Sequence, residues 1–292
     1  MSTAAILLIL LSAVLHAVRD FLTKKANDKL IFVWWYQVWG LVFFLPLFAY
    51  FVYTEGIALP TALYWGLLSG VVYCLYWFLL ARSYEQGDLS KVYPIMRSSP
   101  APVLIFSVLV LDEQISLLGG LGVVLTAAGI YTINLESLSL NALCEPLRSM
   151  RSDRPTQYAF LTLLAVTAYS IIDKLAVDYV HPVIYLFLLS VCGSIFFTPY
   201  VLKTRSRAAI KEEWRREKKS ILLNGIIVLY GYVLILIAFT MEPLSYVVAL
   251  RQLSIVFAVI MGGHLLQEKH KTIRLITASI IVAGAVLISV AE

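Results

Sequence analysis

Two arginines lie within segments of this sequence that are otherwise apolar. Arg97 and Arg251 each come about seven residues after the start of such a segment, which is roughly 10 Å along a helix. A charged side chain in the hydrocarbon region of a membrane costs a few kcal/mol, so it usually faces the protein interior, pairs, or lines a pathway. Because guanidinium groups match carboxylate and phosphate oxygens, Arg97, Arg251 and the adjacent Gln252 are candidate contacts for an anionic substrate.

Two aspartates occupy late positions in two other apolar segments. Asp20 and Asp173 either neutralise the arginines or leave them available to a substrate. A third hypothesis combines both: a carboxylate releases its arginine when it takes up a proton, and the arginine then holds substrate. Both aspartates are therefore ion-coupling candidates, with protons as the coupling ion. His16 and Tyr169, each one helical turn before an aspartate, are candidate substrate contacts.

Aromatic residues form a stripe in the segment 61–84. Tyr73, Trp77 and Tyr84 share one face of a helix, at spacings near four and seven residues. Such a stripe indicates either core packing or the lining of a site for a flat or amphipathic ligand. If carboxylates neutralise the arginines, the alternative substrate is an organic cation held by aromatic rings. The aromatic box would then consist of Tyr73, Trp77, Tyr93, Tyr169 and Tyr232.

Three prolines surround the first arginine, and the second arginine has none at the corresponding positions. They are Pro94, Pro100 and Pro102. Proline removes a helix hydrogen bond, and lipid tolerates the break only where the protein satisfies the freed carbonyl groups. We therefore expect Tyr93–Pro102 to be irregular, to line a cavity and to move as a gate. Ser245–Phe257 should form the straighter opposing wall.

Two glutamates, Glu113 and Glu268, end the two arginine segments. At such an edge a carboxylate caps a neighbouring helix or pairs with a basic residue. We assign both glutamates structural roles.

The composition assigns these residues to a membrane protein. Of the 292 residues, 60% are hydrophobic and 14% charged, and the mean hydropathy is +0.85, whereas a soluble domain needs far more polar surface. Apolar runs near the roughly 20 residues that cross a ~30 Å hydrocarbon core recur along the chain. We expect transmembrane helices at 3–23, 30–53, 61–84, 89–111, 117–135, 157–177, 181–202, 220–240, 244–266 and 273–290.

Lysine and arginine gather in alternate connections between these predicted helices, and the other connections and both tails have none. Cytoplasmic loops collect basic residues, so we expect both termini outside the cell. The largest basic stretch, Lys203–Lys219, is either a short helix on the anionic inner leaflet or a solvated loop.

The two halves of the sequence repeat each other. At an offset of 155 positions, Ser90 meets Ser245 and Glu113 meets Glu268; at 153 positions, Asp20 meets Asp173. Because each half has five predicted helices, an odd number, the second half enters the membrane from the opposite side. The fold class is therefore an all-α integral membrane protein of ten transmembrane helices in two inverted repeats. The repeats are 1–140 and 157–292, joined by a cytoplasmic linker at 141–156.

Other function classes lack support. The sequence has no nucleophile elbow, no His-Glu metal motif and no phosphate-binding glycine loop, so we predict no enzyme, metal or cofactor. The net charge of +5 reflects topology and does not indicate nucleic-acid binding. The partners we expect are a small-molecule substrate and the lipid bilayer. Small residues in 117–135 and 273–290 suit either close helix packing or a homodimer seam.

The closing pattern of each half resembles EamA-type transporters of the drug/metabolite transporter superfamily. In the first half it runs from Asp88-Leu-Ser-Lys-Val-Tyr-Pro-Ile to Asp-Glu113, and in the second from Pro243-Leu-Ser-Tyr-Val-Val to Gln-Glu268. Asp112 and Gln267 stand where that family usually has glycine. The resemblance implies a ten-helix inner-membrane carrier, with a central cavity lined mainly by helices 1, 3, 4, 6, 8 and 9. Its substrates range from amino acids to amphipathic cations and sugar phosphates.

We therefore expect a secondary active transporter or exchanger in the bacterial or archaeal cytoplasmic membrane, working by alternating access. Its substrate would be a small polar or amphipathic metabolite with an anionic group. The first alternative is a multidrug or organic-cation exporter with the aromatic box. An alternative of another class is a membrane sensor or assembly subunit that transports nothing.

Overall fold

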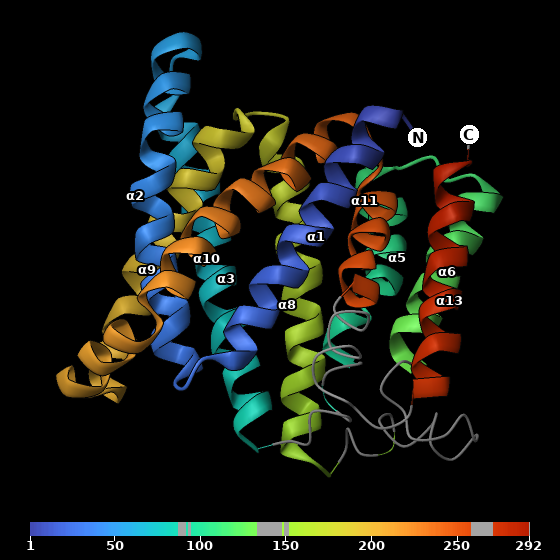
Figure 1. The fold of residues 1–292 in the computed structure, drawn as a ribbon. Coiled ribbons are helices and arrows are strands. Elements are labelled where there is room, and N and C mark those ends of the chain that lie inside the picture. The colour runs from blue at the N-terminus through green and yellow to red at the C-terminus, as the bar shows by residue number, and fades with distance from the viewer. Residues whose placement is uncertain (87–91, 93–94, 133–147, 149–151, 258–270, 292) are drawn as a thin grey trace. The chain divides into compact units, whose positions relative to one another are not determined.

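The computed structural model describes residues 1–86, 92, 95–132, 148, 152–257 and 271–291 (Figure 1). Within these residues the chain is helical and has no strand. Tyr93, Pro94 and Glu268 lie outside the described residues, as does most of the predicted linker. The helices are α1 (Thr3–Lys25), α2 (Lys29–Glu55), α3 (Leu59–Gln86), α5 (Pro100–Leu111), α6 (Leu117–Thr132), α8 (Arg154–Val177), α9 (Pro182–Thr204), α10 (Arg207–Met241), α11 (Leu244–Arg251) and α13 (Lys271–Ser289).

The helices agree with the predicted membrane segments. Six of them, α1, α2, α3, α8, α9 and α10, are long and apolar enough to cross a membrane, and four shorter apolar helices occupy the other predicted segments. The prediction of an all-helical chain with ten apolar segments is confirmed among the described residues. The clearest difference among the described residues is at α10, which begins at Arg207 and not at residue 220.

Helix α10 corrects the prediction for the basic stretch 203–219. The stretch is neither a separate surface helix nor a solvated loop, because α10 begins at Arg207 and continues for 35 residues. No proline or glycine interrupts its first three turns. Trp214 stacks on Trp39 of α2 with ring centroids 5.7 Å apart, and Trp35 Nε1 donates to the carbonyl oxygen of Ile210 at 3.3 Å. These contacts hold the basic start of α10 in helical form against α2.

The chain divides into two compact units, and each contains helices from both halves of the sequence. The first, here called the α6–α13 unit, comprises Met1–Leu10, Leu75–Ile171 and Met241–Glu292. The second, the α2–α9 unit, comprises Leu11–Cys74 and Ile172–Thr240. The boundaries pass through α1, α3, α8 and α10.

Small residues set the packing of the α6–α13 unit. A Cβ atom on Gly284 of α13 would lie 2.6 Å from the carbonyl oxygen of Gly122 on α6, and one on Gly129 would lie 3.1 Å from the carbonyl oxygen of Thr277. These two contacts correspond under the 155-position repeat, so each half supplies the same contact to the other. The glycines therefore serve close packing between α6 and α13.

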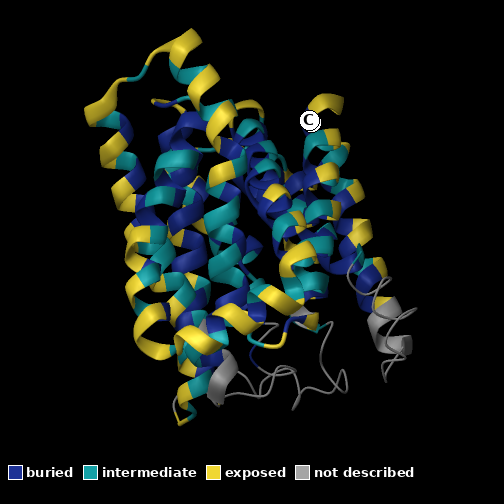
Figure 2. Ribbon diagram, turned by 60° about the vertical axis from the view of Figure 1, so that its left-hand side comes forward, coloured by how far each residue is buried: buried dark blue, intermediate teal, exposed yellow. Residues whose placement is uncertain are grey.

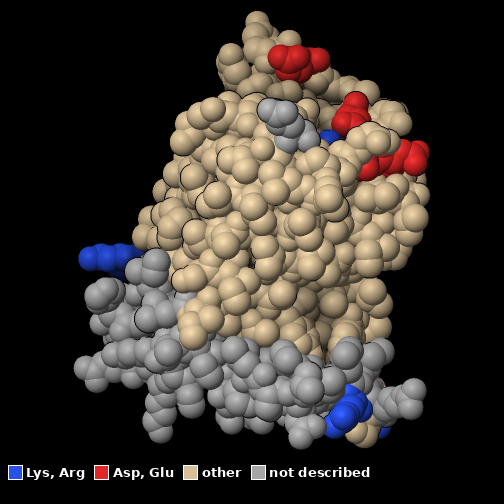
Figure 3. Space-filling view, turned by 90° about the vertical axis from the view of Figure 1, so that its right-hand side faces the viewer, with Lys and Arg blue, Asp and Glu red and all other residues tan. Residues whose placement is uncertain are grey.

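The remaining surfaces of these two helices are apolar. The exposed apolar residues on α6 and α13 include Leu117, Leu121, Val124, Val282 and Val286. Exposed and buried positions alternate along the helices (Figure 2). On the face shown in Figure 3, a broad band carries no charged side chain. An exposed apolar band of this kind suits contact with lipid.

Glycines also set two contacts in the α2–α9 unit. A Cβ atom on Gly40 of α2 would lie 3.1 Å from the carbonyl oxygen of Gly225 on α10, and one on Gly70 of α3 would lie 3.3 Å from the backbone nitrogen of Gly193 on α9. Gly40 corresponds to Gly193 in the sequence repeat and Gly70 to Gly225. The contact between α2 and α10 is therefore repeated between α9 and α3, as a two-fold relation of the repeats requires.

We expect Gly284→Leu to lower the stability of the protein by roughly 1–3 kcal/mol, because an added side chain has no room between α6 and α13. Thermal unfolding of the purified protein in detergent would measure this loss. Gly120→Ala is the matched control, since a Cβ atom there would have Ile115 as its nearest neighbour at 3.7 Å. Equal stability of Gly284→Leu and wild type would contradict the assigned packing.

Candidate functional site

The helix that contains Arg97 is broken directly after it. Helix α5 begins at Pro100, with Ser99 as its N-cap residue. Two short-range backbone hydrogen bonds replace the α-helical pattern here: Ser98 N donates to Ile95 O at 3.2 Å, and Ala101 N donates to Ser98 O at 3.3 Å. Pro100 has no N–H to donate and its ring excludes a continuous helix. The predicted irregularity is present in the described part of this segment.

The segment of Arg251 is also broken, and the expectation of a straight wall at Ser245–Phe257 is wrong. Helix α11 ends at Arg251. Gln252 N then donates to Ala249 O at 3.1 Å, and Ile255 N donates to Gln252 O at 2.9 Å. No proline causes this break, so the residue types gave no signal for it.

The two breaks have the same backbone pattern at a constant offset. Ser98 and Gln252 are 154 positions apart, and each accepts and donates one of the short-range hydrogen bonds described above. The same offset relates Arg97 to Arg251. The arginines are therefore equivalent residues of the repeat, and each is the last one before its break.

The breaks contact each other within the α6–α13 unit. Gln252 Nε2 donates to Ser99 Oγ at 3.3 Å, and both side chains are buried. Both arginines are half-buried. Arg97 lies two residues before Ser99, and Arg251 lies directly before Gln252. The N-terminus of α5 adds the partial positive charge of a helix end. The arrangement collects positive charge around one polar contact in an apolar unit, which suits an anionic group.

Glu113 joins the other ends of the two broken helices. Its carboxylate accepts hydrogen bonds from the backbone nitrogen of Leu244 and, at 3.2 Å, from Ser245 Oγ. These contacts cap the N-terminus of α11. The neighbouring Asp112 has φ 51° and ψ 33°, in the left-handed region. That conformation explains why glycine suits this position in proteins with a similar pattern.

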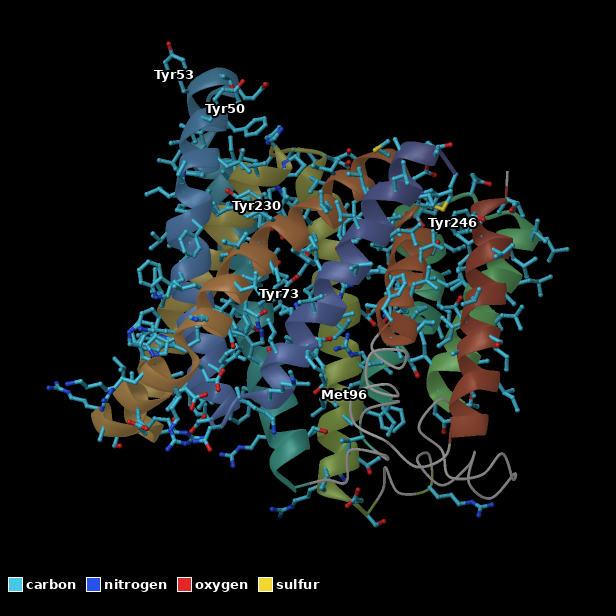
Figure 4. The ribbon with its side chains drawn as sticks, in the orientation of Figure 1. Tyr50, Tyr53, Tyr73, Met96, Tyr230 and Tyr246 are labelled. Atoms are coloured by element: carbon cyan, nitrogen blue, oxygen red, sulfur yellow. The ribbon has the colours of Figure 1, made fainter. Side chains whose placement is uncertain are left out.

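Tyr246 of α11 makes a further contact at this end of the α6–α13 unit (Figure 4). Its hydroxyl accepts a hydrogen bond from Ser116 N at 3.2 Å. The hydroxyl also occupies the space beside Gly119, where any Cβ atom would clash with it. Residue 119 must therefore be glycine if Tyr246 is to reach the start of α6.

In the α2–α9 unit, four hydroxyl groups surround Asp173 of α8. Ser69 Oγ and Tyr185 OH donate to Oδ1 at 2.8 Å and 2.5 Å, and Tyr73 OH lies 3.1 Å from Oδ2. Tyr232 OH also donates to Oδ2 and lies 2.6 Å from Tyr73 OH. We call these five residues the Asp173 cage. Asp173, Ser69 and Tyr185 are fully buried, and Tyr73 lies among the helices in Figure 4.

Asp20, the repeat equivalent of Asp173, has different surroundings. Arg19 donates to its Oδ1 through Nε at 3.0 Å and Nη2 at 2.7 Å. The Asp20 side chain retains 33% exposure. The sequence prediction treated the two aspartates alike, and the structure distinguishes them by partner and by depth.

His16 lies beside the cage on α1. Its ring is 6.3 Å from that of Tyr232, and its Nδ1 lies 2.9 Å from the carbonyl oxygen of Ser12. Because that oxygen can only accept, this hydrogen bond requires a proton on Nδ1. Lys174, the sequence neighbour of Asp173, points elsewhere and donates from Nζ to the carbonyl oxygen of Phe239.

The aromatic candidates separate into different surroundings. Tyr73 and Tyr232 are members of the Asp173 cage. Tyr169 is buried in the α6–α13 unit, where its ring meets that of Tyr76 edge to face at 5.6 Å. Trp77 is half-buried on α3.

Sequence reasoning missed Ser69, Ser99, Tyr185 and Arg19. Of these, Arg19 carried a usable signal, since it is a charged residue in an apolar segment beside a candidate acid. Ser69, Ser99 and Tyr185 resemble many other residues in the chain. Among the described residues, no group of three or more His, Cys, Asp or Glu side chains is placed to hold a metal ion.

Comparisons with known proteins identify the family and the fold of the chain. The model of the EamA-like transporter family matches the chain twice, over residues 3–135 and 156–290. A solved structure described as "Crystal structure of protein" matches with a TM-score of 0.66 at 13% sequence identity, over 98% of this chain and 96% of that one. At this identity the likeness shows the fold. No curated protein sequence matches significantly.

Replacing Glu113 by alanine should lower stability by about 1–2 kcal/mol, because the N-terminus of α11 loses its cap. Asp112→Gly, one position earlier, should leave stability unchanged or raise it, since glycine adopts positive φ without strain. Thermal unfolding midpoints of both variants beside wild type would test the pair. Destabilisation by Asp112→Gly and none by Glu113→Ala would refute the assigned roles.

Proposed function

Because the chain belongs to the EamA-like transporter family, we propose that it is a secondary transporter for a small metabolite that carries an anionic group. The substrate would bind in the α6–α13 unit, where the two broken helices contact each other. The membrane would be the cytoplasmic one, with both termini outside, since alternate connections hold the basic residues.

The paired helix breaks carry this proposal. Each break follows an arginine, and the breaks contact each other through Gln252 and Ser99 at 3.3 Å. A single half-buried arginine would be explained by structural pairing as well as by substrate binding. Here two equivalent arginines stand at two equivalent breaks. One anionic ligand that contacts both arginines would explain both positions. Discontinuous helices are also the usual place where transporters expose backbone groups to substrate.

The same breaks support alternating access. A continuous helix resists bending, whereas a break concentrates the change of φ and ψ in a few residues. Here the parts of each helix on either side of a break can turn against each other without unwinding α5 or α11. Motion about Ser98–Ser99 and Gln252 would open the site to one side of the membrane at a time.

Binding can be tested before the substrate is known. A panel of small metabolites in millimolar concentration would be screened by thermal unfolding of the detergent-purified protein. Carboxylates or phosphates should raise the midpoint, and a ligand at 100 times its Kd adds roughly 2.7 kcal/mol to stability. Arg97→Ala and Arg251→Ala should each remove most of this gain. Arg154→Ala, an exposed arginine of the same unit, is the matched control.

The outcome decides between the candidate functions. Stabilisation by quaternary ammonium compounds that survives in the double arginine variant would refute the anion proposal and favour an organic-cation exporter. Transport itself is tested in proteoliposomes, by uptake of the radiolabelled stabilising compound against unlabelled compound inside. Stabilisation without uptake or exchange would favour a sensor or assembly subunit.

A further inference from the structure

We propose that Asp173 is a proton-binding site of this protein, and that it takes up and releases a proton during the transport cycle. The second half of this proposal rests on the proposed transport function. The first half, proton binding at Asp173, stands on the geometry of the cage and can be tested without a substrate.

The first argument is the isolation of the carboxylate. Asp173 is fully buried in the α2–α9 unit, on a helix apolar enough to cross a membrane. Each hydrogen bond to its oxygens comes from a hydroxyl group. Among the described residues, no lysine or arginine forms an ion pair with it. A buried carboxylate without a counter-ion carries a large desolvation cost, which a bound proton removes.

The second argument is the chemistry of the partners. Arginine, lysine and backbone N–H groups can only donate, so none of them can accept the O–H of a protonated carboxyl group. A hydroxyl can donate or accept, and it can rotate between the two roles. The hydroxyls of Ser69, Tyr185 and Tyr232 can therefore bond the ionised form as donors, with Tyr73 donating to the hydroxyl of Tyr232. When a proton binds, Tyr73 or Tyr232 beside Oδ2 can turn and accept it.

The charged and titratable groups around the cage are compatible with this role. Tyr73 on α3, Tyr185 on α9 and Tyr232 on α10 contact the carboxylate itself. His16 on α1 contacts Tyr232 through its ring. Lys174 follows on α8 itself, and its Nζ bonds a backbone carbonyl of α10. The close hydroxyls of Tyr73 and Tyr232 form a chain from the carboxylate, through which a proton can pass between oxygen atoms.

The cage also gives protonation a mechanical effect. Its hydrogen bonds attach α8 to α3, α9 and α10 through one carboxylate. Protonation changes a carboxylate that only accepts hydrogen bonds into a group that must also donate one, so at least one hydroxyl beside Oδ2 has to turn or leave. A local change of charge thereby alters the attachment between four helices, as switching elements require.

Infrared spectroscopy of the full-length protein in lipid nanodiscs would test proton binding. Spectra collected between pH 5 and pH 9 should show the carbonyl stretching band of a protonated carboxyl group that appears and disappears with pH. Asp173→Asn should abolish this band. Asp20→Asn is the matched control and should retain it, since Asp20 is the repeat equivalent held by Arg19.

A second variant keeps the test decisive if Asp173→Asn does not fold. Tyr185→Phe removes one hydrogen bond to Oδ1 and little volume, so the carbonyl band should move to higher wavenumber. Absence of any pH-dependent carboxyl band, its survival in Asp173→Asn, or an unmoved band in Tyr185→Phe would overturn proton binding. A band that behaves as expected in a protein that transports nothing would refute the transport function and leave the proton site in place.

Discussion

The structure depends on one constraint: inside a membrane, every polar group has to be satisfied by the protein itself. Most of the chain meets it with continuous helices. Where the helices break after Arg97 and Arg251, short-range backbone hydrogen bonds and the contact of Gln252 with Ser99 supply the missing partners. Where a carboxylate is buried, four hydroxyls surround it. At both proposed sites, the one for substrate and the one for a proton, side chains from more than one helix satisfy the buried polar groups.

The internal repeat explains the symmetry of the backbone contacts. Glycine contacts occur in equivalent pairs in each compact unit, and the two breaks share one backbone pattern. The surroundings of the two equivalent aspartates do not follow this symmetry. Asp173 has its cage of hydroxyls, whereas Asp20 has Arg19 as a partner. A symmetric scaffold therefore holds an asymmetric set of chemical groups.

The residues of the site that could be predicted are those that carry a free-energy cost in a membrane. A charge in an apolar segment is expensive wherever it points, so Arg97, Arg251 and Asp173 could be identified without coordinates. Proline has a local effect, so the break before Pro100 could be expected as well. The break at Gln252 could not, since its residues are ordinary helix formers and the tertiary contact with Ser99 stabilises it. Ser69 and Tyr185 could not be predicted either, because their role depends on their contact with Asp173.

The sequence alone determined the membrane class, the number of apolar segments and the repeat, because hydrophobicity and periodicity act along the chain and survive any arrangement of the helices. Tertiary structure decided which equivalent residues became different. It buried Asp173 among hydroxyls and placed Asp20 beside Arg19, and it broke a segment that has no helix-breaking residue. The cage and the break at Gln252 depend on side chains that are more than a hundred positions apart in the sequence, as Ser69 and Asp173 are, and Ser99 and Gln252. Only packing brings such residues together.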